Sequence, residues 1–293
     1  MHRAKKSLGQ NFLKSNLALK KIIEAGEISP DDIILEIGPG KGALTEKLLA
    51  EAGTVIAVEK DRNLFEFLHE KFSKEISSNP PSHKAPDGRG KLILINEDIL
   101  KFEITEKIFS DSPRKFSAEN FLCPSPSLLP RVRSRTFSPP LKYKVVANIP
   151  YNITGAILKK FLTGKSQPSL MVLMVQHEVA KRIIGRDGES LLSISVKSYG
   201  EPKMIMKVPA RYFSPSPKVD SAVIAIKNIS RKVFIENNID EKKFWEIVHA
   251  GFAHKRKKLS NNLKKILKNI PEEWKNKRAE ELSLENWISL AKI

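Results

Sequence analysis

The four residues Asn148-Ile149-Pro150-Tyr151 place an amide, a free backbone carbonyl and an aromatic ring next to one another. They follow an apolar, β-branched run, residues 145–147, that predicts a buried strand. Pro150 has no backbone N–H and biases Ile149 toward extended conformations, so we expect the strand to end here. Ligands of open α/β sheets bind at the carboxyl ends of the strands. Our hypothesis is that this corner holds a nucleobase and presents its exocyclic amine for reaction.

The chemistry expected of this corner follows from the weakness of an aromatic amine as a nucleophile, since its lone pair is delocalised into the ring. The Asn148 amide oxygen and the Ile149 carbonyl oxygen can accept its two N–H bonds and so aim the lone pair. A sulfonium methyl donor needs no strong base, because the proton becomes acidic once the new bond forms. Tyr151 offers a flat face worth ~1–3 kcal/mol of stacking, and the base must leave its own stack to reach it. A strand-ending turn without chemistry is the alternative interpretation.

A second pattern with chemical meaning is Glu36-x-Gly38-x-Gly40-x-Gly42, which follows a buried strand predicted over residues 32–37. A helix over 43–52 and a strand over 54–59, ending in Glu59, complete a βαβ unit with a Gly-rich first turn. The glycines allow close backbone approach, and Glu59 can accept hydrogen bonds from both ribose hydroxyls. A dinucleotide site has a later third glycine, and Glu36 would repel a diphosphate. The pattern therefore favours S-adenosylmethionine, with a purely structural Gly-rich turn as the alternative.

Asp98 ends a third predicted strand, residues 92–98. A carboxylate at this position can accept a hydrogen bond from an adenine amino group. A solvated aspartate is the alternative at that position. Further strands are predicted over 169–176, 204–208 and 222–226, and the last two are expected to form an antiparallel hairpin at the sheet edge. Helices are predicted over 17–25, 60–76, 156–162, 178–184 and 191–199. These elements indicate an α/β, Rossmann-like fold.

The pattern changes to helices alone at about residue 229, so we expect a catalytic domain over 1–228 and a small all-helical domain over 229–293. The Ser-, Pro- and Arg-rich segments 77–90 and 111–141 are expected to be flexible insertions. Lys255, Arg256, Lys257 and Lys258 form a basic run at a helix start. Such a run is suited to phosphate contact, although a solvated face is the alternative.

The composition narrows the function class. The 293 residues carry a net charge of +18, which is typical of proteins that bind nucleic acid. The single cysteine, Cys123, excludes a disulfide framework, a cysteine zinc site or a redox pair, and no metal is expected. There is no long apolar run, and no apolar segment follows the basic N-terminus, so we expect a cytoplasmic protein that does not enter the membrane.

The chain closely resembles the KsgA family, the ribosomal small-subunit RNA adenine dimethyltransferases. The resemblance covers nearly the whole chain apart from residues 77–90 and 111–141. The matching stretches are Gly9-Gln10-Asn11-Phe12-Leu13, Glu36-Ile37-Gly38-Pro39-Gly40, Val58-Glu59, Glu97-Asp98, residues 148–153 and 213–223, and Phe252 with Arg256-Lys257-Lys258-Leu259.

The resemblance implies a seven-stranded methyltransferase sheet and an S-adenosylmethionine site. The implied cofactor contacts are Asn11, Leu13, Gly38, Gly40, Glu59, Asp98 and Asn148. It implies that Phe213 sandwiches the target base against Tyr151. The implied reaction is dimethylation of N6 on two adjacent adenosines near the 3′ end of 16S rRNA. The implied setting is a pre-30S particle, and we expect a monomeric enzyme.

Two other functions fit parts of the sequence. An Erm-like 23S rRNA adenine methyltransferase shares the sheet and the Asn-x-Pro-Tyr corner, but the stretches 218–223 and 256–259 fit the small-subunit family better. A non-catalytic ribosome assembly factor on the same fold predicts a decayed cofactor turn or corner, and both are intact here.

Overall fold

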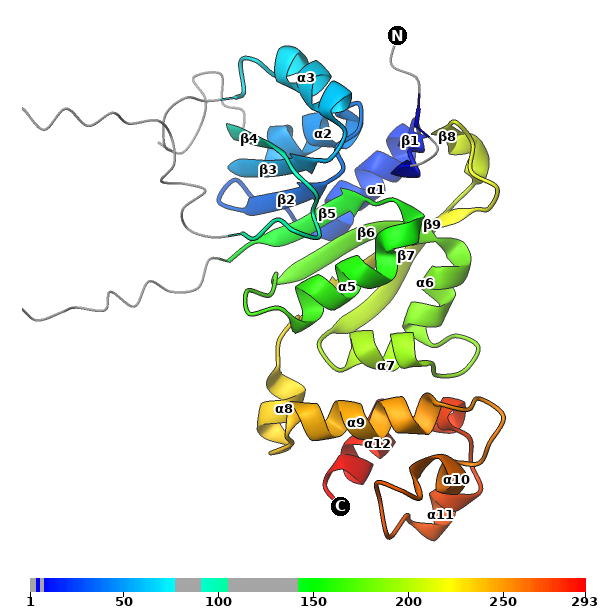
Figure 1. The fold of residues 1–293 in the computed structure, drawn as a ribbon. Coiled ribbons are helices and arrows are strands. Elements are labelled where there is room, and N and C mark those ends of the chain that lie inside the picture. Colours follow the sequence, from blue (N-terminus) through cyan, green and yellow to red (C-terminus); the bar gives the residue numbers. More distant parts are fainter. Residues whose placement is uncertain (1–3, 6–7, 77–90, 105–141) are drawn as a thin grey trace, which may run out of the picture.

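The centre of the molecule is a mixed seven-stranded sheet with the strand order β4-β3-β2-β5-β6-β9-β7 (Figure 1). The computed structural model describes residues 4–5, 8–76, 91–104 and 142–293. The strands are β2 (Ile33–Ile37), β3 (Thr54–Glu59), β4 (Lys91–Asn96), β5 (Lys144–Asn148), β6 (Leu170–Gln176), β7 (Glu201–Val208) and β9 (Ser221–Lys227). The pairings among β2 to β6 are parallel, and β9 is antiparallel to both of its neighbours. All seven predicted strands and the antiparallel edge hairpin are therefore confirmed.

Helices cover both faces of this sheet, which explains why its strands are apolar runs rather than alternating ones. They are α1 (Asn16–Gly26), α2 (Ala43–Glu51), α3 (Arg62–Lys71), α5 (Thr154–Thr163), α6 (His177–Ile184) and α7 (Leu191–Lys197). Val146 packs on the face covered by α1, α2 and α3, while Val145 and Ala147 pack on the face covered by α5, α6 and α7. The predicted helices are all present, with ends shifted by a few residues.

A two-stranded sheet that the sequence analysis did not predict joins the N-terminal arm to the loop between β7 and β9. Its strands are β1 (Phe12–Leu13) and β8 (Phe213–Ser214), which pair antiparallel. The Lys14 N–H also donates to the Tyr212 carbonyl at 2.8 Å. In the same loop, Asp220 Oδ1 accepts from the Ala210 N–H at 3.0 Å. The arm is thereby held beside the carboxyl ends of the parallel strands.

From residue 229 onward the regular structure is helical (Figure 1). The helices are α8 (Lys232–Glu236), α9 (Glu241–Phe252), α10 (Leu259–Leu263), α11 (Glu272–Lys275) and α12 (Leu284–Ala291). They pack around the buried Phe244 and Trp287. The basic run 255–258 lies in the turn between α9 and α10, just before a helix rather than within one.

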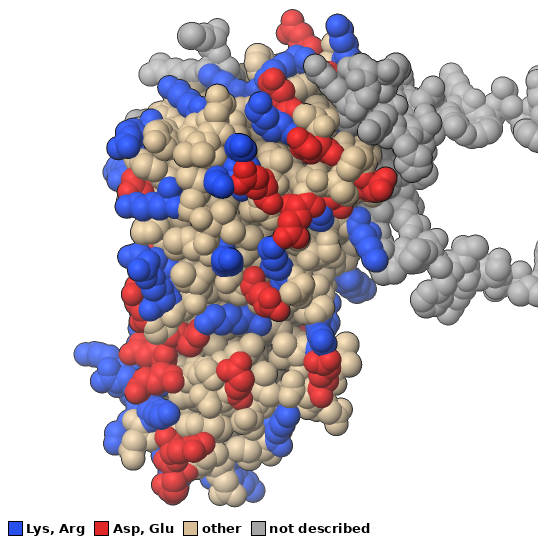
Figure 2. Space-filling model, turned by 180° about the vertical axis from the view of Figure 1, so that it is seen from behind, with Lys and Arg blue, Asp and Glu red and all other residues tan. Residues whose placement is uncertain are grey.

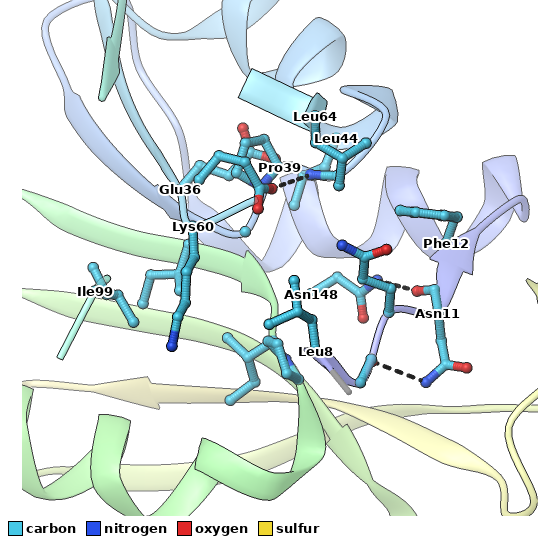
Figure 3. A pocket seen from close by; sticks show the side chains of 18 of the residues that line it. Leu8, Asn11, Phe12, Glu36, Pro39, Leu44, Lys60, Leu64, Ile99 and Asn148 are labelled. Carbon is cyan, nitrogen blue, oxygen red and sulfur yellow. Dashed lines mark hydrogen bonds between the residues drawn. The ribbon is translucent and has the colours of Figure 1, made fainter. Parts of the chain in front are cut away.

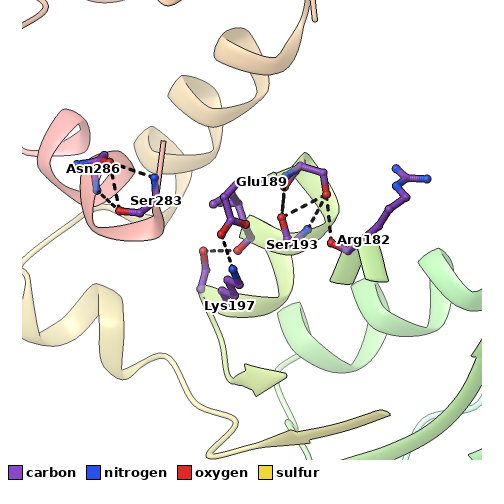
Figure 4. Close-up of polar contacts among 9 residues, drawn as sticks. Arg182, Glu189, Ser193, Lys197, Ser283 and Asn286 are labelled. Carbon is purple, nitrogen blue, oxygen red and sulfur yellow. Dashed lines mark hydrogen bonds and ion pairs between the residues drawn. The ribbon is translucent and has the colours of Figure 1, made fainter. Parts of the chain in front are cut away.

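Polar contacts join this helical part to the sheet. The Glu189 N–H donates to the Glu280 carbonyl at 2.9 Å, and the Glu189 carboxylate pairs with Lys197 on α7 (Figure 4). Ser283 caps α12 by accepting from the Asn286 N–H, and its own N–H donates to the Asn286 side chain. Of these contacts, the Glu189–Glu280 hydrogen bond crosses between the two parts, and it joins the helical part to the loop between α6 and α7.

The two segments predicted to be flexible insertions, residues 77–90 and 111–141, lie outside the described residues. Within the part of the chain that the structure describes, no helix is both long enough and apolar enough to cross a membrane.

Gly251→Ala should destabilise the protein by ~1–3 kcal/mol, because a Cβ at this position would lie 2.3 Å from the buried Trp287 ring. Gly155→Ala is the matched control, since nothing lies within 4 Å of its Cβ position in α5, and alanine there should stabilise by up to ~1 kcal/mol. Urea unfolding measures both. Equal free-energy changes for the two variants would contradict the close approach of Gly251 to Trp287.

Candidate functional site

A cavity of about 440 Å³ lies at the carboxyl ends of the parallel strands (Figure 3). Its walls come from the N-terminal arm, the Gly-rich turn, the ends of β3 and β4, and the corner after β5. The sequence-predicted residues that line it are Asn11, Leu13, Gly38, Gly40, Glu59, Asp98, Asn148, Ile149, Pro150 and Tyr151. Phe213 and residues 255–258 do not line it.

The Gly-rich turn brings the backbone to the cavity surface. Gly38 and Gly40 have φ angles of 63° and 61°, a left-handed conformation that favours glycine. Nothing lies within 4 Å of the Cβ position of Gly38, so one side of this residue is open to a ligand. At Gly40 a Cβ would lie 3.0 Å from the Phe12 ring. The turn therefore needs glycine for its conformation and, at Gly40, for the approach of the N-terminal arm.

Glu59 is held rigidly at the end of β3. Its Oε1 accepts from the Asp61 N–H at 2.8 Å and its Oε2 from the Gly40 N–H at 3.2 Å. The side chain is only 6% exposed, and this burial raises the pKa of Glu59 despite the two backbone donors. Each carboxylate oxygen retains a lone pair that can accept from a ligand hydroxyl.

Asp98 follows β4, the strand that pairs with β3, and also lines the cavity. Its Oδ2 accepts from Lys60 Nζ at 2.8 Å and its Oδ1 from the Leu100 N–H at 3.0 Å. The Lys60 hydrogen bond is the main cause that holds the pKa of Asp98 below its usual range. Asp98 is therefore charged at neutral pH and can accept a further N–H donor.

The Asn148 amide is oriented by the N-terminal arm. Its Nδ2 donates to the Asn11 carbonyl at 3.1 Å, and the Asn11 side chain donates to the Gly9 carbonyl at 3.2 Å (Figure 3). Because the amide nitrogen is used in this way, the oxygen of Asn148 is the atom left to accept from an amine. This is the orientation that the sequence hypothesis requires.

Strand β5 ends at Asn148, just before Ile149 and Pro150, as the sequence predicts. Ile149 is 2% exposed, so its side chain packs in the core, and the residue also lines the cavity. Pro150 ends the strand, and Tyr151 begins a single 3-10 turn, Tyr151–Ile153. The Tyr151 hydroxyl lies 2.5 Å from that of Ser221, which is fully buried on β9. This hydrogen bond fixes the ring of Tyr151 against the sheet.

Phe213 does not line the cavity opposite Tyr151 in this structure, and its role as a second wall for the target base stays a prediction. Phe213 is 3% exposed and belongs to the apolar core that includes Leu13 and Val223. The cause is the pairing of β8 with β1, in which Phe213 is the register partner of Leu13. An aromatic residue that a sequence motif associates with a site can instead pack in the hydrophobic core.

The sequence analysis missed the residue that anchors the N-terminal arm, Asp61. Its Oδ1 accepts from Lys5 Nζ at 2.7 Å and its Oδ2 from Gln10 Nε2 at 2.8 Å. Asp61 also caps α3 by accepting from the Asn63 N–H. An aspartate directly before a helix is the usual capping pattern, so this cap was visible in the sequence, but its contact with the arm was not.

Residues 255–258 are exposed and lie apart from the cavity, in the turn after α9. Figure 2 shows Lys and Arg side chains along the edge of the molecule that carries the β7–β9 loop and this turn, with acidic residues between them. The basic run and the cavity therefore do not form one continuous pocket.

Comparison with known proteins decides the family. The model of the ribosomal RNA adenine dimethylase family matches residues 1–293. The chain belongs to this family. As a member, the protein is an S-adenosylmethionine-dependent rRNA adenine dimethyltransferase.

Individual relatives agree with this membership. The chain is 38% identical over 299 residues to the ribosomal RNA small subunit methyltransferase A of Dehalococcoides mccartyi (strain CBDB1), covering 98% of this chain and 87% of the relative. A dimethyladenosine transferase from Plasmodium falciparum has a TM-score of 0.67 at 23% identity, covering 95% of each chain. The 23S rRNA methyltransferase ErmE has a TM-score of 0.66 at 23% identity, covering 96% of this chain and 98% of that one. At this identity the two solved structures show a shared fold.

Ser221→Ala should destabilise the enzyme by about 1 kcal/mol, because it removes the hydrogen-bond partner of the partly buried Tyr151 hydroxyl. Tyr151→Phe should have a similar effect, and the double variant should cost less than the sum of the two. Urea unfolding of the four proteins gives this coupling energy. Strict additivity would contradict the Tyr151–Ser221 hydrogen bond.

Proposed function

We propose that this enzyme dimethylates N6 of two adjacent adenosines near the 3′ end of 16S rRNA, using S-adenosylmethionine. The observation that carries the proposal is the orientation of Asn148. Its amide nitrogen donates to the Asn11 carbonyl, which leaves its oxygen as the accepting atom, and Asn148 and Ile149 both line the cavity. Two adjacent acceptors are what an exocyclic amine with two N–H groups requires.

The residues of the cavity fit S-adenosylmethionine. We assign Glu59 to the ribose hydroxyls and Asp98 to the adenine amine, since both are fixed carboxylates with accepting capacity left over. Gly38 and Gly40 allow close backbone approach, and Asn11 and Leu13 bound the ligand from the arm. When bound, this cofactor supplies an electrophilic methyl group on a sulfonium.

The target base rests on Tyr151 in this proposal. The Asn148 oxygen and the Ile149 carbonyl accept the two N–H groups, and Pro150 keeps that carbonyl free of the strand ladder. The amine then has its lone pair directed at the cofactor side of the cavity, so that catalysis is largely positioning. The proton leaves after bond formation, and no general base is assigned.

We further propose a division of labour between residues 1–228, as the catalytic domain, and residues 229–293, as an RNA-binding helical domain. Lys255, Arg256, Lys257 and Lys258 are assigned to rRNA phosphates, which is supported by their exposure and by the +18 net charge. The proposed setting is a pre-30S particle in the cytoplasm, with the enzyme acting as a monomer.

The alternatives have less support. An Erm-like 23S rRNA methyltransferase shares the fold at 23% identity, whereas the relatives at 34–38% identity are named small-subunit methyltransferases. A purely non-catalytic assembly factor would not need the oriented Asn148 amide or the fixed Glu59 carboxylate.

The assay that tests the proposal offers the enzyme two substrates, small-subunit particles that lack the modification and large-subunit RNA. We expect N6,N6-dimethyladenosine in the small-subunit rRNA alone, measured by mass spectrometry of RNA digests. The Asn148→Ala variant is the control for enzyme-dependent transfer. Methylation confined to large-subunit RNA would contradict the proposed substrate.

Neutralising residues of the basic run 255–258 should weaken rRNA binding and should make that binding less dependent on salt concentration. Arg256→Gln with Lys257→Gln should reduce the slope of log K against log salt by roughly 0.7–0.9 for each phosphate that the variant no longer neutralises. Lys242→Gln with Lys243→Gln, in the first turn of α9, is the charge-matched control and should leave the slope unchanged. Filter binding at several salt concentrations measures the slopes, and equal slopes for all variants would refute the assignment.

A further inference from the structure

Glu36 is a buried acid that the proposed mechanism does not use. It lies near the end of β2, is 1% exposed and lines the same cavity as Glu59 and Asn148 (Figure 3). Its Oε2 has no hydrogen-bond partner among the residues that the structure describes. A carboxylate oxygen that is buried and unpaired is costly when charged, so this side chain needs a physical explanation.

The surroundings of Glu36 do not neutralise a negative charge. From β3 it faces Glu59, a second acid, and from α2 Thr45, whose hydrogen bonds favour the charged form of Glu36 but bring no positive charge. Among the residues that the structure describes, the cation that acts on it is Lys71 of α3, which is also bonded to the Lys41 carbonyl at 3.2 Å and lies 3.6 Å from Glu46. Burial is the main cause that raises the pKa of Glu36 to about 8, and repulsion from Glu59 adds to it.

Glu36 is therefore protonated in the free enzyme at neutral pH, since a carboxyl with a pKa near 8 still carries its proton at pH 7. A positive charge placed in the same cavity favours the ionised form and lowers this pKa. A neutral ligand in the same place leaves the proton where it is.

We propose that Glu36 discriminates the cationic methyl donor from its neutral product by giving up a proton to solvent when the donor binds. This inference rests on the proposed function, because it requires S-adenosylmethionine in this cavity. The donor carries a sulfonium, whereas the product, S-adenosylhomocysteine, carries a neutral thioether. After methyl transfer Glu36 takes a proton back from solvent, the charge pairing ends, and the product is held less tightly.

The test is calorimetric titration of each ligand at pH 7 in buffers with different ionisation enthalpies. The slope of binding enthalpy against buffer enthalpy gives the protons exchanged. We expect a release of up to about one proton for S-adenosylmethionine and close to none for S-adenosylhomocysteine. Both ligands carry the same amino-acid group, so the titration of that group contributes to both measurements and cancels in the comparison.

The pH dependence of binding should also differ between the donor and the product. Donor affinity should rise between pH 6 and 8 by up to tenfold per pH unit and level off above, because ionised Glu36 binds the donor. The affinity for the product should change little over the same pH range. Glu36→Gln is neutral at every pH and should remove both the proton release and the extra pH dependence, with product affinity within about twofold of the unmodified enzyme.

Glu59→Gln is the matched variant, since the ribose is common to both ligands. It should weaken the binding of both ligands, and the donor should still release more protons than the product, by a smaller margin because the repulsion between Glu59 and Glu36 is removed. Equal proton exchange for donor and product in the unmodified enzyme would overturn the role of Glu36, whether or not the Glu36→Gln variant folds. Failure of the donor to bind at all would instead overturn the proposed function.

Discussion

The hydrogen bond from Asn148 to the Asn11 carbonyl is the interaction on which the rest of the site depends. It fixes which end of the amide faces the cavity. The carbonyl is in place because Lys5 and Gln10 tie the arm to Asp61 and because β1 pairs with β8. One side-chain orientation therefore requires contacts from the N-terminus, from the start of α3 and from the β7–β9 loop.

Positive and negative side chains are concentrated in different parts of the molecule. The surface is strongly basic, which suits a polyanion, whereas the cavity collects acids. Asp98 is paired with Lys60 and stays ionised, Glu59 is held by backbone donors, and Glu36 has no cation at contact distance among the described residues. The same protein thus attracts a negatively charged macromolecule outside and a positively charged small molecule inside.

Much of the fold could be predicted because strands buried on both faces leave apolar runs in the sequence, and their carboxyl ends collect the polar residues Glu59, Asp98 and Asn148. The β1–β8 pairing could not be predicted, since two residues make no pattern. The Tyr151–Ser221 contact joins residues far apart in the chain. The burial of Phe213 could not be predicted, because sequence position alone does not say which way a ring faces.

The strand order also has a consequence for synthesis on the ribosome. Among the strands that the structure describes, β7 pairs only with β9, and β9 also covers the edge of β6. Until residue 227 has emerged, β6 therefore has an open edge and β7 has no partner. The strands that carry Glu59 and Asn148 can assemble earlier, but the Ser221 contact that holds Tyr151 arrives with the last strand. The Gly-rich turn and the ends of β3 and β5 can thus form first, whereas β8, which holds the N-terminal arm beside the cavity, and Ser221, which holds Tyr151, both arrive late.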